Sequence, residues 1–134
     1  MKKRFCTAAC LIFCALLFTA SPCWAKAKGY CYVVGYSYQL KQAYFSPIFA
    51  LDVRDVSYSD EEYTTDVELI QKMESRFQNY LARNQNLDIA KYTISARGAY
   101  KNETIGIKRL MTEREDYKRK GFQAKVLKDF KFTD

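Results

Sequence analysis

The sequence predicts an α+β fold, a two-layer sandwich in the order β-β-α-β-α-β. In it, two helices lie on one face of a mostly antiparallel four-stranded sheet. Several stretches alternate apolar and polar residues with period two, which is typical of strands, and two segments repeat apolar residues every three or four positions, which is typical of one-sided helices. The composition agrees, because 49% of the 134 residues are hydrophobic and only two are prolines, as in a folded chain.

The first two strands are predicted at residues 30–40 and 42–53, where apolar residues alternate. A turn centred on Leu40 and Lys41 pairs the strands so that both apolar sets share one face, and this shared face is the reason for preferring that register. Pro47 cannot donate a hydrogen bond to the ladder, so it indicates an edge or a bulge. The apolar sets are Tyr30, Tyr32, Val34, Tyr36, Tyr38 and Leu40, and then Ala43, Phe45, Pro47, Phe49, Leu51 and Val53.

The first helix is predicted from Thr65 to about Arg83. Thr65 to Glu68 matches the capping-box pattern, in which a threonine oxygen and a glutamate three residues later satisfy free amides at the helix start. An apolar stripe follows at helical spacing, so one side of this helix is expected to pack on the sheet. The stripe consists of Val67, Ile70, Met73, Phe77, Tyr80 and Leu81.

The remaining elements are a strand at 91–100, a helix from the N-cap Asn102 to Lys120, and a last strand at about 122–132. Asparagine is a favoured N-cap, and Gly121 suits the position after a helix end, where the backbone adopts a left-handed conformation. The inner side of this helix is expected to hold Ile105, Leu110, Met111 and Tyr117. One domain is therefore predicted over residues 29–132.

Residues 1–25 have the three parts of a secretory signal peptide: Lys2, Lys3 and Arg4, then an uncharged apolar run, then small residues at the exit. Cleavage is expected after Ala25 or Ala27. The alternative is a retained anchor, because the uncharged run is long enough to span a bilayer. We expect a periplasmic or secreted protein, with no stable membrane insertion once the leader is removed.

Four of the five cysteines lie in the leader, so the mature chain keeps Cys31 alone and has no internal disulfide. A lone exported cysteine is a reactive nucleophile, an intermolecular bridge or a small buried residue of the first strand, and the last interpretation is favoured because no histidine is present to activate the thiol. The absence of histidine also excludes histidine-based triads and metal sites. We predict no cofactor, no metal and no catalytic residues.

Charge is uneven along the mature chain. Removal of the three leader cations from the 22 Lys and Arg leaves 19 against 15 acids, a net charge of +4. Residues 97–134 carry eleven basic and six acidic groups, a net charge of +5, whereas residues 26–96 carry −1, so a surface for a polyanion or an acidic partner is predicted in the C-terminal third. The candidate binding residues are Arg97, Lys101, Lys108, Arg109, Arg114, Lys118 and Arg119. The competing interpretation is an ordinary solvated helix end, because Glu113, Glu115 and Asp116 interrupt the basic run.

Three functions remain open. The first is an exported, non-enzymatic interaction module of the cell envelope, inhibitor-like or immunity-like, whose partner is another envelope or secreted protein. The second is a binder of an anionic or glycan envelope polymer through the basic residues, and the third is a small enzyme without histidine. Nucleic acid is not an expected partner, given export. An open tyrosine face lined by basic side chains would favour the polymer, whereas a face covered by helices would favour the protein partner.

Overall fold

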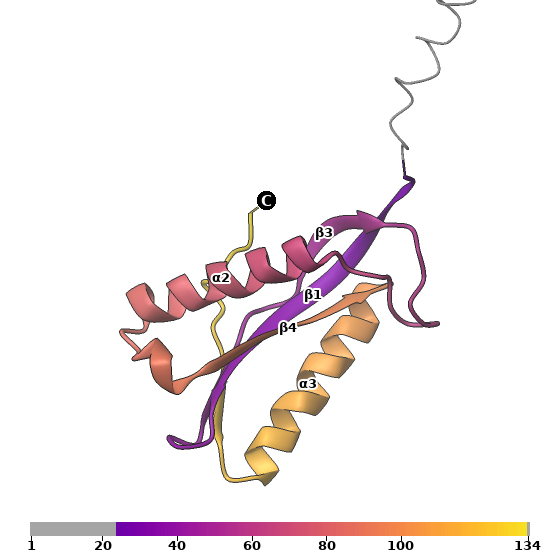
Figure 1. The fold of residues 1–134 in the computed structure, drawn as a ribbon. Helices are drawn as coiled ribbons and strands as arrows, with labels where there is room; N and C mark the ends of the chain where they lie inside the picture. The colour runs from indigo at the N-terminus through magenta and orange to yellow at the C-terminus, as the bar shows by residue number, and fades with distance from the viewer. Residues whose placement is uncertain (1–23, 134) are drawn as a thin grey trace, which may run out of the picture.

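The computed structural model describes residues 24–133, and the predicted leader lies almost wholly outside them. Figure 1 shows one long strand, β1, with the other strands on both of its sides and two long helices flanking the sheet. In the part of the chain that the structure describes, no helix is long and apolar enough to cross a membrane. The elements are β1 (Lys26–Ser37), β2 (Gln42–Phe45), β3 (Phe49–Arg54), α2 (Val67–Asn84), the 3-10 helix η1 (Ile89–Lys91), β4 (Thr93–Tyr100), α3 (Glu103–Arg119) and β5 (Gln123–Val126).

The α+β class is confirmed, and the five-stranded sheet is mixed rather than purely antiparallel. β1 pairs antiparallel with β4 along one edge and with β2 and β3 along the other. β5 pairs parallel with β2. The predicted count of four strands is exceeded because the stretch at 42–53 forms two strands, β2 and β3, instead of one.

The break between β2 and β3 sends the apolar residues of the second stretch to different faces. Pro47 lies in this break, as its missing amide hydrogen predicts. The buried Ser46 keeps the chain hydrogen-bonded to β1 at this break. Its amide donates to Val33 O at 2.8 Å, and its hydroxyl accepts from Val33 N at 2.8 Å. The pairing with β1 slips by one residue across the break, from Val34 opposite Phe45 to Cys31 opposite Phe49. A slip of one residue reverses the face on which every later side chain lies.

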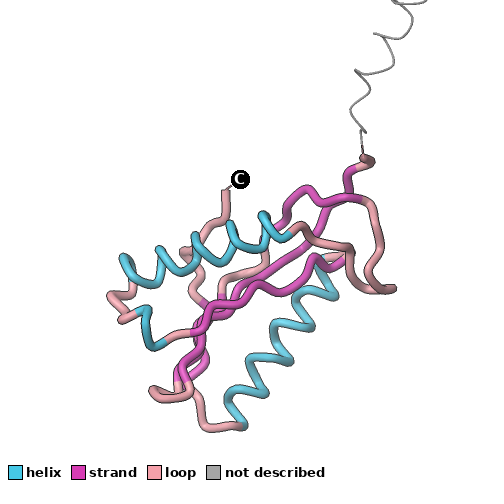
Figure 2. Tube along the Cα trace, in the orientation of Figure 1, coloured by secondary structure: helices cyan, strands magenta, loops and turns pink. Residues whose placement is uncertain are grey.

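The predicted two-layer arrangement, with both helices on one face, is wrong: α2 and α3 lie on opposite faces of the sheet (Figures 1 and 2). Cys31 and Val33 of β1 pack in the core beneath α2, whereas Tyr32 and Val34, which alternate with them, pack beneath α3. The prediction failed because it assigned the whole 42–53 set to one face. The α2 core is Cys31, Val33, Leu51, Val53, Met73, Phe77, Leu81, Ala99 and Phe130, and the α3 core is Tyr32, Val34, Ala43, Phe45, Tyr100, Leu110, Tyr117, Phe122 and Ala124.

α2 buries the centre of its predicted stripe but not its start. Met73, Phe77 and Leu81 are fully buried, whereas Val67 is 67% exposed. The capping box does not form, because Asp66 is the N-cap and makes no side-chain cap bond. The hydroxyl of Thr65 instead donates to the carbonyl of Gly98, which ties the start of α2 to the end of β4.

α3 begins and ends as the sequence predicts. Asn102 accepts from the amide of Ile105 at 2.9 Å, and Gly121 has a left-handed backbone with φ of +84°. Leu110 and Tyr117 face the sheet, but Met111 is 59% exposed, so its predicted place on the inner side is wrong. The reason is angular, because Leu110 and Met111 point about 100° apart and cannot both face the sheet.

The last predicted strand is shorter than expected, since β5 ends at Val126. From there the chain passes round the edge of the sheet toward the α2 side, and Phe130 completes the α2 core. Its ring meets that of Phe77 edge-on, with 5.1 Å between ring centroids. The C-terminal tail thus covers one side of α2, and the outer edge of β4 lies along the other.

Candidate functional site

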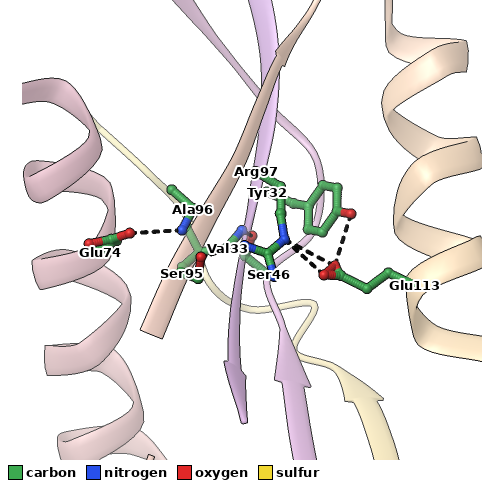
Figure 3. A network of polar contacts seen from close by, with 8 residues as sticks. All are labelled: Tyr32, Val33, Ser46, Glu74, Ser95, Ala96, Arg97 and Glu113. Atoms are coloured by element: carbon green, nitrogen blue, oxygen red, sulfur yellow. Dashed lines mark hydrogen bonds and ion pairs between the residues drawn. The ribbon is translucent and has the colours of Figure 1, made fainter. Parts of the chain in front are cut away.

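A polar network joins β1, β4 and α3 inside the α3 layer (Figure 3). Arg97 of β4 donates from Nε to Glu113 Oε1 of α3 at 2.8 Å, and Tyr32 of β1 donates its hydroxyl to Glu113 Oε2 at 3.1 Å. The Arg97 guanidinium also donates to the hydroxyl of Ser95. Because Tyr32 stands opposite Arg97 in the sheet, the register of β1 and β4 brings both donors to one carboxylate.

Burial and charge in this network hold each group in one protonation state. Burial, together with the nearby Glu113 carboxylate, raises the pKa of the Tyr32 hydroxyl, which therefore keeps its proton and donates. Burial by itself would lower the pKa of the Arg97 guanidinium, but the bond to Glu113 reverses this effect and raises it. The predicted binding residue Arg97 is thus committed to an internal, half-buried ion pair and fixes α3 on the sheet.

Lys101 and Arg109 face the acidic loop at 55–63. Arg109 pairs with Glu61, and Lys101 donates to Ser57 Oγ at 2.7 Å with its ammonium over the ring of Tyr63. The acidic loop and the basic C-terminal third are far apart in the sequence, but in the fold the loop neutralises part of the positive charge of that third. Beside these contacts lies a cavity of about 350 Å³, lined by Glu61, Thr104, Ile105, Lys108, Arg109 and Thr112.

The opposite flank of α3 carries the feature that sequence reasoning missed. Ile107 is 43% exposed and Met111 is 59% exposed, although both are large apolar side chains. Arg114 and Lys118 follow at the spacings that extend the same line along a helix. We call these four residues, Ile107, Met111, Arg114 and Lys118, the α3 stripe. Arg114 donates from Nε to Ala124 O at 3.3 Å, so this flank of α3 faces β5.

The structure does not bring the seven predicted basic residues together into one patch. Arg97 is internal, Lys101 and Arg109 face the acidic loop, Arg114 and Lys118 belong to the α3 stripe, and Lys108 lines the cavity beside the loop. Lys118 and Arg119 also pair with Glu115 and Asp116, one turn earlier in the helix. The sequence does contain a pattern that indicates the stripe. Ile107 and Met111 are four residues apart, so they share one side of the helix, and this side differs from the one that carries the buried Leu110 and Tyr117.

The tyrosine face of β1 is covered. Tyr32 is 2% exposed and is packed against Tyr100 and Phe45 beneath α3. Tyr117 of α3 closes over Tyr36, with 5.7 Å between ring centroids. Tyr30 and Tyr36 are partly buried, and the end of the face reaches the surface at Tyr38, which is 59% exposed. The centre of this face, at Tyr32 and Val34, is therefore part of the core.

Cys31 is fully buried in the α2 core. Burial, with a smaller contribution from the charge of Glu62, raises the pKa of its thiol from 9.0 to about 12. A thiol in this setting stays protonated and unreactive at neutral pH, as the interpretation of Cys31 as a buried strand residue expects. Among residues 24–133, no group of three metal-binding side chains is close enough together to hold an ion.

Comparison with family models, with curated proteins and with solved structures finds no match for this chain.

Proposed function

We propose that the protein is an exported, non-enzymatic interaction module of the cell envelope, which binds another envelope or secreted protein through the α3 stripe. The observation that carries the proposal is the exposure of Ile107 and Met111 next to Arg114 and Lys118. Methionine and arginine are enriched in protein interfaces, where an apolar centre with a charged rim is typical. The partner surface should accordingly have an apolar centre and carboxylates around it.

The covered tyrosine face favours a protein partner over a polymer. A glycan would need a row of exposed rings for stacking, whereas Tyr32, Tyr100 and Tyr117 are each less than 10% exposed and Tyr38 is mostly exposed only at the end of the face. The half-buried ion pair of Arg97 with Glu113 and the surface ion pair of Arg109 with Glu61 further reduce the positive charge available to a polyanion. These contacts support an inhibitor-like or immunity-like role, which requires a surface rather than reacting groups.

Export depends on the leader, and the strand limits support one of its two predicted cleavage positions. β1 starts at Lys26, where Lys26 pairs with Arg54 and Ala27 with Val53. Cleavage after Ala25 leaves the whole strand, whereas cleavage after Ala27 removes two paired residues. We therefore expect a mature chain that starts at Lys26. The intact mass of the protein from a periplasmic or secreted fraction tests this, and a chain that still begins at Met1 in the membrane fraction would contradict export.

The binding surface is tested by affinity capture from envelope extract with three forms of the protein: wild type, Met111→Glu and Val67→Glu. Both variants place a carboxylate on an exposed apolar position of a helix, but Val67 lies on α2, on the other side of the sheet. We expect one partner that Met111→Glu fails to retain and that Val67→Glu retains as well as wild type. Equal retention by both variants would refute the α3 stripe as the binding surface.

A further inference from the structure

A polar groove runs between α2 and the outer edge of β4, on the face of the sheet opposite the α3 stripe. Its volume is about 440 Å³. α2 contributes side chains spaced three and four apart, Ile94 lies near the start of β4 and Tyr92 just before it, and η1 lies at one end. The lining consists of Gln71, Glu74, Ser75, Gln78, Ile89, Ala90, Tyr92 and Ile94.

The backbone of β4 offers hydrogen-bonding groups to this groove. The amide of Ala96 points away from β1 and donates to Glu74 Oε1 of α2 at 3.1 Å (Figure 3). Along a strand, every second residue presents its amide and carbonyl to the same side, so the amide and carbonyl of Ile94 also point outward. Within the described residues, β1 is the only strand that pairs with β4.

The other half of this edge is already covered by an added segment of the chain itself. The backbone amide of Tyr63 donates to Ala99 O, and the backbone amide of Lys101 donates to Glu61 O, both at 2.8 Å. Glu62 and Tyr100 form an isolated antiparallel bridge there. The loop thus lies beside the end of β4 as a strand would, whereas the groove lies beside its start.

We propose that the groove binds an extended peptide segment of another protein, which adds to the edge of β4 as a further strand and places a lysine or arginine beside Glu74. Charge complementarity selects this occupant, because Glu74 is the one charged side chain among the described residues that line the groove. A peptide carbonyl takes the place of the Glu74 carboxylate at the Ala96 amide. The released carboxylate then pairs with the cation of the peptide.

Strand addition explains why a polar groove can bind. Main-chain hydrogen bonds to Ile94 and Ala96 supply affinity without an apolar pocket, and alternate side chains of the peptide face α2. Gln71, Ser75 and Gln78 are suited to these side chains because amides and hydroxyls both donate and accept. Until a peptide arrives, Glu74 protects the edge from uncontrolled pairing, as charged side chains do at sheet edges. This binding is independent of the α3 stripe.

The test uses random dodecapeptides displayed on phage and selected against the purified protein. Selected peptides are synthesised and titrated against wild type, Glu74→Lys, Ser75→Arg and Glu68→Lys. Glu68→Lys is the matched control, because it makes the same charge change on the same helix outside the groove. Thermal melts verify that each variant folds, and Ser75→Arg fills the groove from an exposed helix position.

We expect the selected peptides to contain lysine or arginine and to shift the amide resonances of residues 92–96. Glu74→Lys and Ser75→Arg should weaken binding about tenfold or more, since like charges brought together at an interface are strongly unfavourable. Glu68→Lys should retain wild-type affinity. The proposal is overturned if no peptide is selected, if the peptides lack cations, or if they bind Glu74→Lys as well as wild type. Self-association that Glu74→Lys abolishes would also overturn it, because the occupant would then be a second copy.

Discussion

Phe77 is the residue on which the packing of α2 depends most directly. Its side chain is fully buried, and its ring lies edge-on to Phe130 and stacked with Tyr80. A buried aromatic side chain removes about 150–200 Å² from water, worth about 4–5 kcal/mol at about 25 cal/mol per Å². Because neighbours relax only partly into the space, Phe77→Ala should cost about 3–5 kcal/mol. The free energy of unfolding of a domain of this size is about 5–15 kcal/mol in total, so the variant keeps little stability.

Urea denaturation, followed by the fluorescence of the tyrosines, measures this cost. Asn79→Ala is the control, because Asn79 is an exposed residue on the same helix, and its change should be less than about 0.5 kcal/mol. Arg76 is less suitable, because it contacts the carbonyl of Thr133 and the ring of Phe132 in the tail. Equal costs for Phe77→Ala and Asn79→Ala would refute the assigned face of α2 and with it the separation of the two cores.

Two further predictions concern the polar network and the buried thiol. Glu113→Ala should lower the free energy of unfolding by about 1–3 kcal/mol, because Arg97 and Tyr32 lose their acceptor inside the structure. Glu115→Ala, which removes only an exposed ion pair with Lys118, should leave the urea midpoint unchanged, and equal effects of the two variants would contradict the network. Stability should also fall as the pH rises above about 9, because the pKa of Cys31 is raised from 9.0 to about 12 and that of Tyr117 from 10.0 to about 12. Above these pH values the unfolded chain loses protons that the folded chain keeps. The free energy of unfolding therefore falls by about 1.4 kcal/mol per pH unit for each group. In Cys31→Ala this fall in stability should begin near pH 10 instead. Urea melts across this pH range measure it, and a wild-type stability that does not change with pH would refute the burial of Cys31 and Tyr117.

The sequence predicted the elements better than their arrangement. Period-two and helical patterns are local, so the strand at 30–40 and both helices were found with ends displaced by a few residues. The layer order depended on the register across Ser46 and Pro47, where the chain slips by one residue. That slip is set by the bonds of the Ser46 side chain and amide to Val33, and no composition pattern records them.

The candidate site shows the same division. The sequence located the basic residues, but their partners come from distant segments: Glu61 for Arg109, and the Ala124 carbonyl for Arg114. How many of these basic side chains remain available to bind a partner therefore could not be judged before the fold was known. The groove beside β4 was missed altogether, because a free strand edge is a property of the sheet and not of the residues in it.

The most direct test of the α3 stripe as a protein-binding surface is crosslinking in living cells. A photoreactive phenylalanine analogue is placed at Met111 or, as the control, at Val67, in the full chain expressed in the cells from which the sequence comes. Both positions are exposed, at 59% and 67%. Irradiation should give one discrete heavier product from Met111, containing a second protein, and none from Val67. No product from Met111, or the same product from both positions, would contradict the proposed interaction surface.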